Sequence, residues 1–214
     1  SFMKNTFSFC FALLSLIQTS YSQWNANPAI NTPVCTAVSD QIDLRMMGDG
    51  KGGALITWKD YRNGGTSSPD IYMQRISSSG YPLWATDGVS LCTDNADQST
   101  PALVTDMQGG AIVAWSDWRS GVERDIYAQR IDSNGTALWT TDGIVVSNKS
   151  EREHNEKIIS DGMGGAIIVW EQMDNFTFEW DIWAQRINGS GMPLWTSGGI
   201  PICNVNAHRL NAKV

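Results

Sequence analysis

Charged residues are sparse in this sequence, and positive charges are the scarcer kind. Charged residues make up 17% of the 214 positions, with 15 Lys and Arg against 22 Asp and Glu, so the formal net charge is −7. Nucleic acids and anionic membrane surfaces attract basic proteins, which makes both poor candidate partners. The apolar run Phe7–Ile17 is too short to span a bilayer, so we expect no membrane-spanning segment.

Familiar catalytic and metal-binding motifs are also missing. The sequence contains no G-x-S-x-G, HExxH or P-loop, and its two histidines, His154 and His208, accompany no Ser or Cys in a catalytic motif. No Cys/His spacing resembles a zinc site. The turn at residues 49–53 resembles a calcium loop, but it lacks the second and third carboxylates that such a loop needs. We therefore predict no catalytic residue, no metal site and no cofactor.

Cysteine is scarce, with four residues in the whole chain. Cys92 and Cys203 each follow a recurring Trp by eight residues, and Cys35 takes the corresponding place in a partial repeat. Equivalent positions in successive repeats point the same way from different sheets, whereas a disulfide needs Cα atoms within roughly 7 Å. We expect these three to be buried free thiols that act as small hydrophobic residues.

The sequence is rich in Gly and Trp, and both follow an internal repeat. Trp58, Trp115 and Trp170 lie 57 and 55 residues apart. The consensus sequence of the repeat is D-x-x-G-G-A-x-x-x-W-x-D-x-R, followed after a loop by D-I-(Y/W)-x-Q-R-I and after a Gly turn by L-W-x-x-x-G. A fixed period of this length is typical of repeat architectures.

Each repeat reads as four short strands. In the middle repeat we expect strands at 101–105, at 111 to about 117, at 125–131 and at 137–139, with an apolar stretch behind the last. The second strand opens with AIVAW, which is apolar on both faces and therefore predicts cover on both sides. A solenoid has a shorter period, and separate sandwiches need about 100 residues each. The pattern predicts an all-β, β-propeller-like fold with four-stranded blades.

The first 22 residues stand outside this repeat. Ser1 and Phe2 resemble a cloning remnant, and Lys4, the apolar run that follows it and the small residues Ser20 and Ser22 have the form of a cleaved secretory signal peptide. We expect a mature chain that starts at Gln23 and is secreted or held at the cell surface.

The remaining chain divides into whole and partial repeats. Residues 24–36 match the final strand of a partial blade, full blades are expected at 37–93, 94–148 and 149–204, and 205–214 match the start of a further blade. Propellers typically have about four to eight blades. We therefore expect either a fragment of a longer protein, which we favour, or copies that associate to complete a ring.

A set of two Asp and two Arg recurs in the first two repeats, as Asp60, Arg62, Asp70 and Arg75 and as Asp117, Arg119, Asp125 and Arg130. The third repeat keeps only the later pair. A hairpin brings the first three members of each set to one end, where Asp and Arg can pair bidentately. The set either lines a binding face or closes each hairpin as a salt bridge, and its recurrence favours the salt bridge. Asp60, Arg62, Asp117 and Arg119 remain candidate ligand-binding residues.

Tryptophans outside the recurring positions are stronger candidates. Six of the ten occupy the two recurring positions, where we expect packing, and Trp24 fits the second of these. Trp118 and Trp180 flank the loop between the second and third strands, so we expect them to contact a ligand. Glu151 and Glu153 fall in a charged connector that we expect to be a solvated loop.

The repeat, carried by residues 24–214, resembles propeller-like repeats of secreted and cell-surface proteins of the Bacteroidota, which often end in a type IX secretion sorting domain not present in these residues. The resemblance implies an extracellular location and transfers no catalytic residues.

Three functions remain open. The first is a secreted, non-enzymatic binding or adhesion module that presents loops to a glycan or protein. The second is a non-catalytic fragment or scaffold of an extracellular hydrolase such as a glycosidase. The third is a surface protein that self-assembles through open blade edges. An enzyme would need unique, convergent groups that break the symmetry of the repeats.

Overall fold

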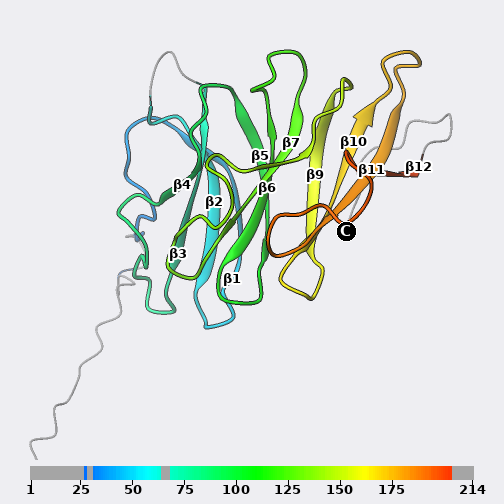
Figure 1. Ribbon diagram of the computed structural model, residues 1–214. Helices are drawn as coiled ribbons and strands as arrows, with labels where there is room; N and C mark the ends of the chain where they lie inside the picture. Colours follow the sequence, from blue (N-terminus) through cyan, green and yellow to red (C-terminus); the bar gives the residue numbers. More distant parts are fainter. Residues whose placement is uncertain (1–26, 28–30, 64–67, 204–214) are drawn as a thin grey trace, which may run out of the picture.

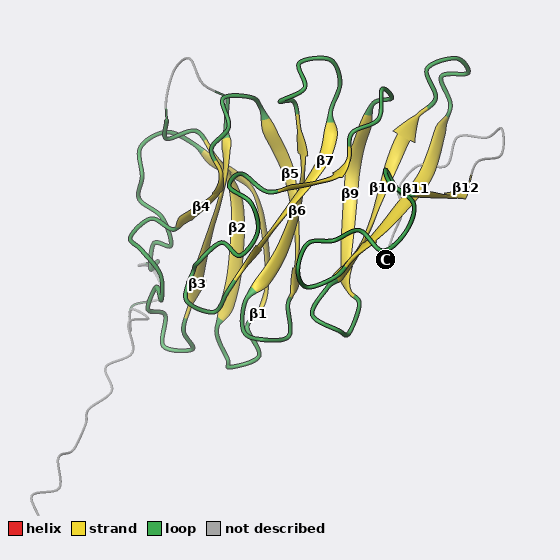
Figure 2. Ribbon diagram, in the orientation of Figure 1, coloured by secondary structure: helices red, strands yellow, loops and turns green. Residues whose placement is uncertain are grey.

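The computed structural model describes residue 27 and residues 31–63 and 68–203. The expected signal peptide, Cys10, Trp24, His208 and the expected start of a further blade lie outside these residues. The described part consists of strands and loops without a helix (Figure 2). It accordingly holds no helix long and apolar enough to cross a membrane.

Twelve strands form three antiparallel sheets of four strands each, one sheet per full repeat. The first sheet contains β1 (Gln41–Gly48), β2 (Ala54–Asp60), β3 (Asp70–Ile76) and β4 (Val89–Cys92). The second contains β5 (Gln98–Thr105), β6 (Ala111–Asp117), β7 (Asp125–Ile131) and β8 (Ile144–Ser147). The third contains β9 (Glu153–Ser160), β10 (Ala166–Met173), β11 (Trp180–Ile187) and β12 (Ile200–Cys203).

The sheets fan out around their first strands, as propeller blades do. In each sheet the strands follow one another in chain order from inside to outside. The inner strands β1, β5 and β9 are neighbours, and each sheet packs face to face on the next (Figure 1). The expected all-β, propeller-like fold with three full repeats is confirmed.

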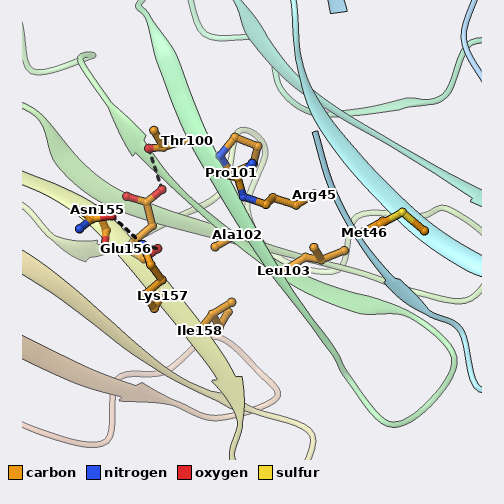
Figure 3. Close-up of a pocket in the computed structure, with 10 residues that line it drawn as sticks. All are labelled: Arg45, Met46, Thr100, Pro101, Ala102, Leu103, Asn155, Glu156, Lys157 and Ile158. Atoms are coloured by element: carbon orange, nitrogen blue, oxygen red, sulfur yellow. Dashed lines mark hydrogen bonds between the residues drawn. The ribbon is translucent and has the colours of Figure 1, made fainter. Parts of the chain in front are cut away.

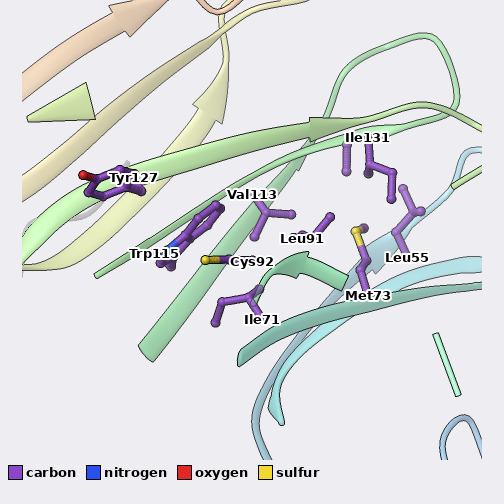
Figure 4. Close-up of a cluster of buried hydrophobic side chains, with 10 residues drawn as sticks. Leu55, Ile71, Met73, Leu91, Cys92, Val113, Trp115, Tyr127 and Ile131 are labelled. Carbon is purple, nitrogen blue, oxygen red and sulfur yellow. The ribbon is translucent and has the colours of Figure 1, made fainter. Parts of the chain in front are cut away.

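Two apolar cores hold the three blades together. The first core joins Leu55 and Met73 of the first blade to Val113 and Trp115 of the second (Figure 4). The second core joins the opposite face of the second blade to the third. Strand β6 contributes side chains to both cores, and all seven of its residues are buried. This confirms the cover on both sides that its unbroken apolar sequence predicts.

The recurring Trp and the last Gly of each repeat pack against each other. Gly143 has a φ of 88°, and a Cβ there would lie 2.6 Å from Cη2 of Trp115 and 2.7 Å from the Ala128 carbonyl oxygen. Gly88 meets Trp58 in the same way. The repeat therefore ends in Gly because the indole ring occupies the space of a side chain and the backbone is left-handed.

Two further recurring side chains tie each blade to the next. Arg75 bonds Asp49 of its own blade and donates to the Ser133 carbonyl of the second blade, 3.3 Å away. The indole of Trp84 donates to the same carbonyl at 3.1 Å. The second blade repeats both contacts on the Gly189 carbonyl of the third. The Q-R-I and L-W motifs are thus explained by packing between blades.

The fourth strand of the blade was predicted wrongly. In the middle blade it spans Ile144–Ser147, whereas Ala137 forms only an isolated bridge with Ile131. The chain between them turns at Gly143, whose amide bonds the Thr140 carbonyl, so residues 137–139 never continue as a strand. The first strand also begins earlier than predicted, at Gln98.

The three described cysteines are free, as predicted. Only Cys92 is buried, and burial raises the pKa of its thiol to about 12. Cys35 and Cys203 are partly exposed, which corrects the expectation that all three are buried.

Residues 35 and 36 dock on the first blade as the end of the first blade docks on the second. Arg62 donates to the Cys35 sulfur, as Arg119 does to that of Cys92. Thr36 donates to Asp87, and its counterpart in the next repeat makes the matching bond. Residues 31–40 form no strand, so their place in a partial blade stays a prediction.

The outer face of the first blade leaves apolar side chains uncovered. Leu44 and Met46 are 59% and 62% exposed, whereas Leu103, the counterpart of Met46 in the second blade, packs into the core between the blades. Self-association through such a face stays a prediction.

Candidate functional site

Each inner strand carries a bulge at the same place. The pairing register slips between Ile42 and Arg45 in β1, between Ser99 and Ala102 in β5, and at the matching point of β9. The first bulge residue has a left-handed backbone in all three, with φ values of 52° at Asp43, 53° at Thr100 and 59° at Asn155. Such conformations are costly for residues other than Gly, and they concentrate at functional sites.

The bulge recurs, but its residues do not. The two positions hold Asp43-Leu44 in the first blade, Thr100-Pro101 in the second and Asn155-Glu156 in the third. This contrasts with the hairpin residues, which repeat almost unchanged. The bulges are therefore the place where the blades break their symmetry, as a binding or catalytic site requires.

A pocket of about 350 Å³ opens where the three bulged strands meet. Figure 3 shows its lining, with Arg45 and Met46 on β1, residues 100–103 on β5 and residues 155–158 on β9. The ammonium of Lys157 bonds the Asn155 side-chain oxygen at 2.6 Å. The pocket falls in the size range of small-molecule sites.

Glu156 forms one wall of this pocket and is buried between two blades. Its two carboxyl oxygens accept hydrogen bonds from the Thr100 hydroxyl at 2.9 Å and the Ser116 hydroxyl at 2.8 Å. Burial raises the pKa of Glu156 to about 7, and the hydroxyl bonds offset part of that rise. Glu156 therefore fixes the bulges of β5 and β9 relative to each other.

A second pocket, of about 370 Å³, adjoins the first and shares Thr100 and Asn155 with it. Its other lining residues are polar or basic: Ser99, Ser116, Arg124, Arg152 and His154. We call the two adjoining pockets the inner-strand groove. The Arg124 guanidinium bonds Ser99 and Asp97, which holds it at the rim.

Both predicted ligand-contacting tryptophans lie beside the second pocket. Arg124 lies 5.8 Å from the ring centre of Trp118, which is 38% exposed. The ring of His154, another residue that lines the pocket, meets Trp180 edge-on, with 4.3 Å between ring centres. Trp118 and Trp180 thus each contact a residue that lines the second pocket, whereas Trp183 packs in the core between the blades. Ligand contact by the pair stays a prediction.

The surroundings of His154 lower its pKa, which favours the neutral imidazole at pH 7. Burial lowers its pKa below 6.5; Glu171, whose carboxylate lies 3.9 Å away, opposes this, and the positive charges of Arg152, Arg124 and Lys157 add to it. Glu171 is itself buried and accepts a bond from the Asn155 amide at 2.8 Å. The pocket therefore combines a neutral imidazole with two guanidinium groups.

The recurring Asp and Arg of the hairpins do not line this groove. Asp60 is fully buried and accepts bonds from the Trp58 indole at 2.6 Å and from the Arg62 guanidinium through both oxygens. Arg62 also lies 3.8 Å from the Tyr72 ring centre. Asp117 and Arg119 repeat this arrangement. These internal bonds account for all four residues, and a role in ligand binding stays a prediction.

Strand β9 overturns one expectation. The connector expected to be a solvated loop becomes a strand at Glu153, which is fully buried, and Glu156 is buried three residues later. The high charge of this segment suggests a solvated loop. In the strand, however, the bulge changes the spacing of the inward-facing residues, so that Glu153, Glu156 and Ile158 are buried. The sequence does contain a signal for this strand: Glu153 occupies the repeat position of Gln41 and Gln98, and all three residues begin the first strand of their blade.

The Asp-Gly turn is closed by its own chain. One oxygen of Asp49 accepts the amides of Lys51 and Gly53, both at 2.8 Å, and the other bonds Arg75. Among the described residues, no group of three or more His, Cys, Asp or Glu is placed to hold a metal ion.

No protein-family model and no curated protein sequence matches this chain. Solved structures do match. One is an endo-arabinase of Bacteroides thetaiotaomicron, 13% identical, with a TM-score of 0.45 over 73% of this chain and 59% of that one. Another is an α-L-arabinofuranosidase of Fusarium graminearum with arabinobiose, 10% identical, with a TM-score of 0.47 over 70% and 44%.

A third is an α-L-arabinanase of Penicillium chrysogenum with arabinobiose, 16% identical, with a TM-score of 0.47 over 72% of this chain and 48% of that one. This chain therefore spans about half of the length of each of these three proteins. The propeller-like fold itself rests on the three sheets of this chain.

Proposed function

We propose that the inner-strand groove binds an oligosaccharide, and that the chain is the sugar-binding part of an extracellular protein that recognises or degrades glycans. The observation that carries this proposal is the placement of Trp118 and Trp180 beside a pocket lined by hydroxyl, amide and guanidinium groups. Flat aromatic rings pack against the apolar faces of sugars, and convergent polar groups bond their hydroxyls.

The location of the pocket supports the same function. It lies at the bulges where the three blades differ, on strands rather than on loops alone. Rigid strands hold side chains in fixed positions before a ligand arrives, which reduces the cost of ordering them on binding. An extracellular location agrees with the signal peptide expected from the sequence.

Hydrolysis is a second candidate, favoured by one observation. The pKa of Glu156 is about 7 in a pocket wall, as a general acid requires. A glycosidase needs two carboxyl groups on opposite sides of the scissile bond. Both oxygens of Glu156 face hydroxyl groups of the protein, and the only other carboxylate of the bulges, Asp43, lies on a different blade. The described geometry therefore supports binding more strongly than catalysis.

The test is a glycan array that carries neutral and acidic oligosaccharides, with arabinobiose among the neutral ones. Wild-type chain should bind a restricted set of sugars, and Trp118→Ala and Trp180→Ala should each weaken binding about tenfold or more without a change in thermal melting. Tyr81→Ala, at an exposed aromatic residue of a distant turn, serves as the control and should bind normally. Binding to no sugar, or equal binding by all variants, would contradict the proposal.

Hydrolysis is tested on the bound sugars by product analysis. Activity that Glu156→Gln abolishes while binding is retained would establish the second candidate. Bound sugars that stay intact would leave a binding protein.

A further inference from the structure

The inner-strand groove is basic, although the protein is acidic. The formal net charge of the chain is −7. Four cationic side chains line the groove: Arg45, Arg124, Arg152 and Lys157. One carboxyl group lines it, that of Glu156, and this group is buried against two hydroxyls. Positive charge is thus gathered where the blades lose their symmetry, against the overall balance of the chain.

The cations differ in how their charge is used. Arg124 is partly neutralised by Asp97, and Lys157 bonds oxygens of its own strand. Arg152 is exposed at the second pocket, and its guanidinium makes no hydrogen bond or ion pair with another described residue. Its five donors are therefore available to a ligand, and no carboxylate lines the second pocket to compete for them.

The geometry points to acidic oligosaccharides, with a carboxylate on the sugar ring, as the ligands of this groove. This inference rests on the proposed function and names its ligand class. A guanidinium group matches a carboxylate through two parallel hydrogen bonds, so Arg152 would hold the sugar acid while Trp118 and Trp180 pack against the rings. The hydroxyl of Ser99, which accepts a bond from Arg124, still has its hydrogen to donate to the same group.

A uronic-acid polymer also fits the extent of the groove. Arg45 and Lys157 line the first pocket and Arg124 and Arg152 the second, so charges on successive sugar units meet cations along the groove. A neutral glycan would bond the hydroxyl and amide groups but would leave this row of cations unused. The arrangement thus separates acidic from neutral sugars by charge and not by shape alone.

The test is calorimetric titration of the chain with trigalacturonate, with the neutral galactose trimer and with a sulfated galactose trimer, at low and moderate salt. We expect trigalacturonate to bind at least about tenfold more tightly than the neutral trimer, and added salt to reduce this preference. Arg152→Gln should lose about tenfold for trigalacturonate and little for the neutral trimer. Because the Arg152 side chain is exposed and its guanidinium makes no hydrogen bond or ion pair with another described residue, this variant should melt like the wild type.

Lys51→Gln is the matched control, since it removes one exposed positive charge from a distant turn and should bind all three sugars normally. Equal affinity for the acidic and neutral trimers, or an unchanged affinity in Arg152→Gln, would overturn the inference while the proposed function stands. Preference for the sulfated trimer over trigalacturonate would overturn the choice of carboxylate. Failure of all three sugars, together with an empty glycan array, would overturn the proposed function itself.

Discussion

Glu153→Gln tests whether a buried acid in β9 is held protonated by the fold. Glu153 stands where the other two blades have Gln41 and Gln98, and its side chain is fully buried. One carboxyl oxygen accepts a bond from the Ser147 hydroxyl, and the other has no partner among the described residues. Burial raises the pKa of Glu153 from 4.5 to about 8, and the nearby charge of Asp125 adds to the rise.

The sign of the effect follows from proton linkage. Between pH 4.5 and 8 the folded chain keeps a proton on Glu153 that the unfolded chain releases. The contribution to stability is therefore fully present at low pH and is lost as the pH rises through this window. Each pKa unit corresponds to about 1.4 kcal/mol, so the loss between pH 5 and 8 is about 3–4 kcal/mol. Glutamine has no proton to lose, and this part of the pH dependence should vanish.

The assay is urea unfolding of both proteins at pH 5 and pH 8. The free energy of unfolding should fall by about 3–4 kcal/mol more in the wild type than in Glu153→Gln over this interval. Acids that are not coupled to Glu153, such as Glu156, titrate equally in both proteins and cancel. Glu151→Gln, two residues away and partly exposed, is the control and should keep the wild-type slope. Equal slopes in wild type and Glu153→Gln would refute the reasoning.

Three further predictions concern packing and pH. Trp115→Ala should lower the free energy of unfolding by about 3–5 kcal/mol in urea, because the side chain is fully buried, and lost sugar binding with unchanged stability would contradict its role in the core. Gly143→Ala should lower the melting temperature more than Gly162→Ala, since both backbones are left-handed but only the first Cβ meets an indole ring. Binding of an acidic sugar should strengthen more in the wild type than in His154→Phe as the pH falls below 6.5, because His154 gains a proton while the titration of Glu156 is common to both proteins; calorimetry measures the difference.

The repeat made most of the fold predictable from the sequence. The period, the turn glycines and the apolar AIVAW segment depend on local pattern, and the structure has β6 and β7 at the predicted residues. The fourth strand was misplaced because the sequence of residues 137–139 resembles a strand. In the structure, Ala137 pairs with Ile131 through a single isolated bridge. Short pairings of this kind are decided by neighbouring turns and not by the residues themselves.

The candidate site was only partly predictable. Trp118 and Trp180 were identified because they do not repeat, and the structure places both beside one pocket. Arg152, His154 and Glu156 were not identified as site residues because they lie in a highly charged segment whose sequence resembles a solvated loop. Their positions depend on a bulge, which shifts the alternation of the strand and buries an acid next to exposed bases. An alignment of the three repeats would reveal these positions only if the two bulge residues of each inner strand were aligned with one another.

The most direct test of the sugar-binding account is a crystal structure of the chain with trigalacturonate. The account predicts a sugar acid within hydrogen-bond distance of the Arg152 guanidinium, in the pocket beside Trp118 and Trp180. A trimer bound elsewhere, for example on the uncovered apolar face of the first blade around Leu44, would contradict the assignment of the inner-strand groove as the binding site.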